Sequence, residues 1–123
     1  MNNKGKYKIG KVSDFVKSKG WFFGHFAQDE LLQSDDVEIA WQKIFTKKAL
    51  PEDKHYHRDS VEINIVISGE VRITINREKH ILHKGEFYII WPETIVEEVE
   101  AGEDTELIVV RSPSMNDKVI IEK

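Results

Sequence analysis

The chain has 123 residues, a formal net charge of −4 and no cysteine. This length suits one compact domain, so we expect a single domain over residues 1–123 with a core spanning about residues 21–113. Its 18 Lys and Arg residues are interleaved with 22 Asp and Glu residues, which excludes the clustered positive charge of a nucleic-acid-binding surface. The lack of cysteine excludes disulfides and thiolate zinc sites, so any metal must be held by nitrogen and oxygen.

No segment has the apolar length that a membrane span requires, which is about 20 residues. The first six residues, MNNKGK, also lack the apolar run of a signal peptide. We therefore expect a soluble, cytoplasmic protein without a membrane partner.

Short runs rich in Val, Ile, Thr, Phe and Tyr recur from residue 21 onward. Turn residues separate them at roughly 8 to 12 residues, the spacing of an all-β sandwich or barrel. Ser68-Gly69-Glu70 predicts a tight hairpin, because glycine accepts the positive φ of such a turn. Little helix is expected beyond short turns at 13–19 and 28–33. The predicted strands are residues 21–26, 37–46, 61–67, 71–76, 79–82, 87–91, 95–99 and 106–111.

The most restrictive pattern is His55-Tyr56-His57, followed by Glu62 and then, after a β-rich run, by Gly69. Residues i and i+2 of an extended segment share a face, and a carboxylate on the next strand can reach the same point. Two imidazoles and a carboxylate are suitable ligands for a divalent metal. The alternative is a surface histidine pair beside a structural acid.

Period-2 alternation along residues 61–67 places Glu62 and Asn64 on one face and three isoleucines on the other. With Glu62 facing the interior, Asn64 is a candidate substrate-binding residue; the alternative is a core polar residue with satisfied hydrogen bonds. The isoleucine face then needs a cover from a second sheet, the N-terminal segment or another subunit. We expect a homodimer.

The motif at His55, His57, Glu62 and Gly69 resembles the first motif of the cupin superfamily, although Ala49 stands where that motif begins with Gly. The resemblance covers roughly residues 21–113 and implies a double-stranded β-helix, or jelly-roll barrel, with a short N-terminal extension. The ending VVRSPS with Asp-Lys at 117–118 is similar to small single-domain cupins found with sugar-nucleotide and polysaccharide genes.

The second cupin motif is eroded in this chain. Six residues instead of five separate Gly85 from Pro92, and Thr94, Glu97 and Ala101 stand where the motif has Gly, His and Asn. Alternation along 95–101 puts the more apolar set, which includes Glu97, toward the barrel, so Glu97 is a candidate fourth ligand or a base. The alternative is a solvated edge, since Glu97 belongs to an acidic run.

A site with two histidines and two glutamates suits Mn, Fe, Zn, Ni or Co. The resemblance implies a metal-dependent enzyme for a small-molecule ligand such as a carbohydrate, with isomerase, epimerase or lyase chemistry. Tyr88 is a candidate substrate-binding residue because aromatic faces suit sugar rings, although aromatics in a β core more often pack. Two alternatives stay open: a non-catalytic binding or accessory module with a degenerate metal site, and an Fe(II) dioxygenase.

Overall fold

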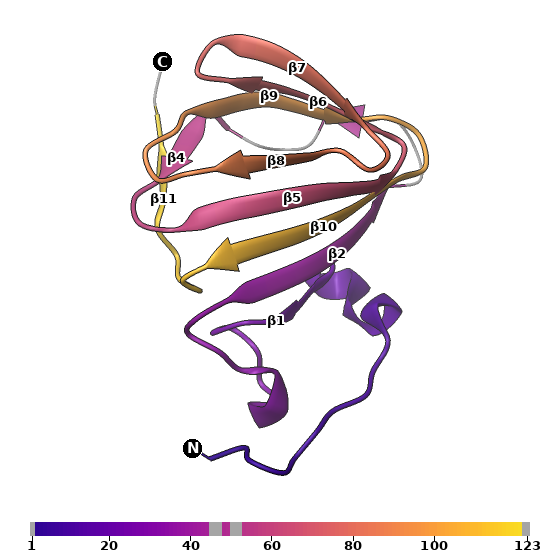
Figure 1. Cartoon of the computed structure of the whole chain (residues 1–123), viewed down its shortest axis with the longest axis vertical. Coiled ribbons are helices and arrows are strands. Elements are labelled where there is room, and N and C mark those ends of the chain that lie inside the picture. The colour runs from indigo at the N-terminus through magenta and orange to yellow at the C-terminus, as the bar shows by residue number, and fades with distance from the viewer. Residues whose placement is uncertain (1, 45–47, 50–52, 122–123) are drawn as a thin grey trace.

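Two antiparallel β-sheets form the protein, as the computed structural model shows (Figure 1). The structure describes residues 2–44, 48–49 and 53–121. The first sheet has the order β1-β2-β10-β5-β8, and the second has the order β11-β4-β9-β6-β7, with β3 paired to β9. The strands are β1 (Trp21–Phe23), β2 (Glu38–Ile44), β3 (Lys48–Ala49), β4 (His55–His57), β5 (Val61–Ser68), β6 (Glu70–Ile75), β7 (Glu78–His83), β8 (Phe87–Ile90), β9 (Val96–Ala101), β10 (Thr105–Ser112) and β11 (Lys118–Ile120).

Each of the eight predicted segments contains a strand, which confirms the all-β class. The extra strands β3, β4 and β11 have only two or three residues each. Two short 3₁₀ helices, η1 (Val12–Ser18) and η2 (Glu30–Leu32), lie in the N-terminal part. None of the helices in the described residues is long and apolar enough to cross a membrane.

Alternate residues of both sheets fill the interior. Val66, Val71, Ile90 and Leu107 are each at most 2% exposed and belong to one apolar cluster. Burying a side chain of this size contributes about 1.5–3 kcal/mol. The period-2 pattern thus determines which face of each strand turns inward.

The turn at Gly69 has the positive φ that was predicted, 81°, but it does not form a hairpin. Strand β5 pairs with β10 and β8, whereas β6 pairs with β7 and β9, so the chain passes from one sheet to the other at Gly69. A Cβ at this position would lie 2.4 Å from Oγ1 of Thr105. Glycine is therefore required by both conformation and space.

Candidate functional site

A cavity of about 670 Å³ lies inside the barrel. Five of the six residues predicted for the site line it: His55, His57, Glu62, Asn64 and Tyr88. Asn64 and Tyr88 are direct cross-strand neighbours on β5 and β8. The volume falls within the range of pockets that hold small molecules, about 300–1,000 Å³.

Strand β4 carries both histidines into the interior, where His55 is 4% and His57 is 3% exposed. Their ring centroids are 5.2 Å apart. Nδ1 of His55 donates to the backbone carbonyl of Asp53 at 2.7 Å, and Nδ1 of His57 donates to Oδ1 of Asp117 at 3.0 Å. A neutral imidazole that donates from Nδ1 has its lone pair on Nε2.

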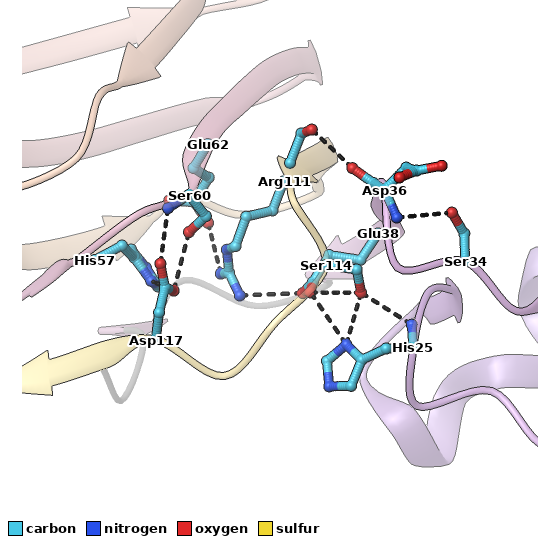
Figure 2. A network of polar contacts seen from close by, with 11 residues as sticks. His25, Ser34, Asp36, Glu38, His57, Ser60, Glu62, Arg111, Ser114 and Asp117 are labelled. Carbon is cyan, nitrogen blue, oxygen red and sulfur yellow. Dashed lines mark hydrogen bonds and ion pairs between the residues drawn. The ribbon is translucent and has the colours of Figure 1, made fainter.

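Asp117 is a buried site residue that the sequence did not identify. Its Oδ2 accepts from the backbone N–H groups of Asp59 and Ser60, at 2.8 and 2.7 Å, and its Oδ1 accepts from the Ser60 hydroxyl as well as from His57 (Figure 2). Burial by itself raises the pKa of this carboxyl, but these hydrogen bonds together lower the pKa to about 2. Asp117 is therefore ionised at neutral pH and holds the His57 ring in one orientation.

Three buried polar atoms in the cavity-lining residues lack a hydrogen-bond partner among the described residues. They are Nε2 of His57, Nδ2 of Asn64 and Nε of Arg111. Buried polar groups in folded proteins are nearly always paired, with protein, water or a bound molecule. Water or a molecule bound in the cavity would supply the missing partners.

Arg111 on β10 holds two acidic side chains of the cavity. Nη2 contacts Oε1 of Glu62 at 2.9 Å, and Nη1 contacts Oε2 of Glu38 at 3.1 Å (Figure 2). The guanidinium also lies 5.3 Å from the ring centroid of Trp21, a cation–π contact. The carboxylate of Glu62 is thus engaged by a cation that sequence reasoning did not foresee.

The same network continues toward the N-terminal part of the chain. The Ser114 hydroxyl lies 3.0 Å from Oε1 of Glu38, and both the backbone N–H and Nδ1 of His25 contact this hydroxyl, at 2.9 and 2.6 Å (Figure 2). Glu38 is only 4% exposed. Segments 25–38 and 111–117 are therefore joined at the edge of the cavity.

The face predicted for Glu97 is wrong. Glu98 has a φ of +55°, and the register between β6 and β9 shifts at this point, so β9 contains a bulge. The bulge places both Val96 and Val99 on the cavity side, while Glu97 lies opposite Thr74 and does not line the cavity. The structure does not bring Glu97 to the two histidines.

The missed residues Arg111, Ser114 and Asp117 all belong to the C-terminal segment VVRSPS followed by Asp-Lys. In the sequence this segment is informative only through its similarity to the ending of other small cupins. A buried acid at 117 has no local signature, because its partner His57 is 60 residues away in the chain.

A family model described as a cupin domain matches residues 45–110, more than half of the chain. The chain is a cupin. A search of curated proteins found no match.

Three solved structures with a similar fold are distant from this cupin in sequence. KdgF from Halomonas sp. has a TM-score of 0.61 and 18% identity, covering 93% of this chain and 98% of that chain. A Klebsiella pneumoniae protein with a double-stranded β-helix domain has a TM-score of 0.63 and 18% identity, covering 96% and 100%. Streptomyces Pac13 with uridine has a TM-score of 0.65 and 16% identity, covering 95% and 92%. Identities this low establish the shared double-stranded β-helix fold and nothing finer.

Cupins commonly bind a metal, and the histidines of this cupin fit that role better than its acids do. Anchoring of both Nδ1 atoms is the arrangement usual for imidazoles that ligate through Nε2. However, Glu62 is paired with Arg111 and Glu97 lies off the cavity. Within the described residues no three His, Asp, Glu or Cys side chains are grouped to hold a metal. In this arrangement the donor set does not fit a three- or four-ligand centre.

Proposed function

We propose that this cupin is an enzyme that binds a small, polar, sugar-like molecule in the barrel and acts on it by acid–base chemistry. His57 is the proposed proton-transferring residue, and Asp117 is the residue that positions it. The observation that carries the proposal is the buried His57–Asp117 pair, in which Nδ1 is bonded to an ionised carboxylate while Nε2 has no partner among the described residues.

The chemistry follows from this tautomer. Nε2 takes a proton from a substrate carbon beside a carbonyl, and the Asp117 carboxylate stabilises the imidazolium that forms. Returning the proton to the adjacent carbon, while the hydroxyl proton moves between the two oxygens, completes an isomerisation. Returning a proton to the same carbon on its opposite face completes an epimerisation. Returning it to a departing hydroxyl completes the loss of water, which is lyase chemistry.

Other residues of the cavity support binding of a substrate rich in hydroxyl or carbonyl oxygens. Nδ2 of Asn64 and Nε of Arg111 are donors that need acceptors. The ring of Tyr88 lies beside Asn64 on the neighbouring strand and offers an apolar face to a sugar ring.

One structural neighbour makes a particular reaction class worth testing. Pac13 is a nucleoside dehydratase, and structures of variants of that protein contain uridine. The likeness itself concerns the fold alone. Uridine therefore belongs in a substrate panel for this cupin, beside free aldoses and uronic acids.

The test follows the panel by proton NMR in D₂O, which detects both exchange at carbon and loss of water. We expect one member of the panel to react with the unmodified protein. The His57→Gln variant should turn it over about 10²- to 10⁴-fold more slowly, because the general base is lost. Asp117→Asn should also slow the reaction, because the carboxylate that orients the ring is lost.

The matched control is His80→Gln, which removes a histidine from β7 that does not line the cavity. It should leave turnover unchanged. Undiminished turnover in His57→Gln would contradict the proposal. Binding of a panel member without any turnover would instead favour a non-catalytic binding module.

A metal-binding cupin is the second candidate, and the anchored Nδ1 atoms of His55 and His57 favour it. It requires Glu62 to leave Arg111. Elemental analysis of protein purified without added metal distinguishes the candidates. About one metal per chain, lost in the His55→Ala/His57→Ala variant, would support a metal centre; negligible metal in both proteins would support the metal-independent reading.

A further inference from the structure

A second cavity of about 670 Å³ lies between the N-terminal segment and β1. All of its lining residues fall within residues 8–32, which include η1, β1 and η2. Figure 1 shows both short helices near β1, at the edge of the first sheet. The cupin-domain model matches residues 45–110, so this cavity belongs to a part of the chain that the matched domain does not include.

Aromatic side chains form much of the wall of the second cavity. Phe15 and Phe22 contact each other with ring centroids 6.1 Å apart and ring planes tilted by 55°. Trp21 and Phe26 form an edge-to-face pair, also with centroids 6.1 Å apart. Aromatic rings attract one another at centroid distances of about 4.5–7 Å. A further aromatic ring therefore suits the chemistry of these walls.

The apolar side chains around the second cavity are not fully covered by the chain itself. Neither η1 nor η2 contains a buried residue. Phe26 remains 40% exposed, and Phe15, Phe22 and Leu32 are only partly buried. The described residues thus leave apolar surface at this cavity, and covering that surface with an apolar group is favourable.

The polar groups of the second cavity are paired within the protein or lie in water. Nζ of Lys8 contacts Oδ2 of Asp29 at 2.8 Å, and the Ser18 hydroxyl lies 2.8 Å from the carbonyl oxygen of Trp21. The other polar lining residues are exposed: Lys11, Asp14 and Gln28. Of the buried polar atoms that lack a partner among the described residues, none belongs to this cavity, whereas three belong to the barrel cavity. The second cavity thus offers an occupant apolar contacts and no unpaired buried donor.

The second cavity and the barrel cavity share a wall. Ser18, Trp21 and Phe26 line both of them. On the barrel side, the Trp21 ring lies 5.3 Å from the guanidinium of Arg111, one of the residues with an unpaired donor. A molecule bound beside Arg111 therefore has the second cavity next to it.

We propose that the second cavity is a subsite for an apolar aromatic group carried by the same molecule whose polar part occupies the barrel cavity. This inference rests on the proposed function for the polar part, and it narrows the substrate class to sugar-like compounds with an aromatic substituent, such as aryl glycosides. The donors of Asn64 and Arg111 suit the hydroxyl-rich part, and the aromatic walls suit the ring. Moving a ring of phenyl size from water into apolar surroundings corresponds to about a 10- to 100-fold gain in affinity.

Isothermal titration calorimetry with paired glycosides tests the subsite. Each aldose and uronic acid of the substrate panel is offered as its methyl glycoside and as its naphthyl glycoside, and naphthol is offered alone. The methyl glycoside reports on the barrel cavity, and naphthol reports on the second cavity. We expect naphthol to bind, and the naphthyl glycoside of at least one sugar to bind about 10- to 100-fold more tightly than its methyl glycoside.

Two variants fill the second cavity without removing an existing side chain from its walls. Ala27→Phe adds a ring at a lining residue, and Gly10→Phe adds one at a lining residue where a Cβ meets no heavy atom within 4 Å. Each variant should lower the affinity for the naphthyl glycoside to that for the methyl glycoside, while the affinity for the methyl glycoside stays unchanged.

The matched control is Lys84→Phe, which adds the same ring at an exposed residue that lines neither cavity, and it should retain the full difference between the two glycosides. Equal affinities of the two glycosides for the unmodified protein would overturn the inference. So would a difference that survives both Ala27→Phe and Gly10→Phe, a difference that is lost in Lys84→Phe, or a failure of naphthol to bind. If no glycoside binds but naphthol binds and Ala27→Phe abolishes its binding, the proposed function fails while the aromatic subsite stands.

Discussion

The carboxylate of Asp117 organises the loop that follows β4. It binds two backbone N–H groups, one hydroxyl and the His57 ring, and its side chain is only 2% exposed. Removing a carboxylate with so many partners would leave several buried donors unpaired, each costing about 1–3 kcal/mol. A single residue thus links the stability of this loop to the orientation of the histidine.

The lowered pKa of Asp117 predicts a specific dependence of stability on pH. The pKa is about 2 in the folded protein against an ordinary value of 3.8, so its stabilising contribution is complete above pH 3.8 and is lost as the pH falls toward 2. The shift corresponds to about 2 kcal/mol. Urea unfolding at several pH values should show this loss in the unmodified protein and a shallower one in Asp117→Asn. Equal slopes in the two proteins would contradict the assignment.

At the scale of elements, two local irregularities decide how the strands are used. Gly69 lets the chain pass between sheets with one intervening residue, and the bulge at Glu98 turns Glu97 away from the cavity. Both occur at positive φ, a region that residues other than glycine enter at a cost of about 1–2 kcal/mol. The first uses glycine and the second does not.

Replacing Gly69 should be more costly than replacing another glycine of similar conformation. Gly69→Ala adds a Cβ against Thr105, so we expect a loss of about 2–4 kcal/mol. Gly85 has a similar φ of 84° but no heavy atom within 4 Å of a Cβ placed there, so Gly85→Ala should lose only about 1 kcal/mol. Chemical denaturation of the two variants measures the difference. Equal losses would mean that conformation alone, and not the contact with Thr105, makes glycine necessary.

At the scale of the whole molecule, the two outer faces of the barrel have opposite characters. The second sheet carries charged residues such as Arg72 and Glu100 on its outer face, whereas the first sheet carries apolar residues such as Ile63 and Ile89 there. A protein of 123 residues buries a modest fraction of its surface when it folds, so the placement of apolar residues on the two faces matters for its stability.

The sequence by itself determined the features that depend on near neighbours. The eight segments of β pattern, the shared face of His55 and His57, and the inward face of Glu62 and Asn64 follow from a two-residue period. The positive φ at Gly69 follows from local turn chemistry. These features can be predicted from the sequence because side-chain alternation and turn preference act within a few residues.

Only the tertiary structure decided which of these residues work together. The pairing of His57 with Asp117 spans 60 residues, that of Glu62 with Arg111 spans 49, and the bulge that removes Glu97 from the cavity appears only when β9 is paired with β6. Contacts of this kind depend on how distant strands are registered against one another, and no local pattern records that register. The two predicted histidines therefore line the cavity, whereas the acidic residue that contacts His57 is determined by the tertiary structure.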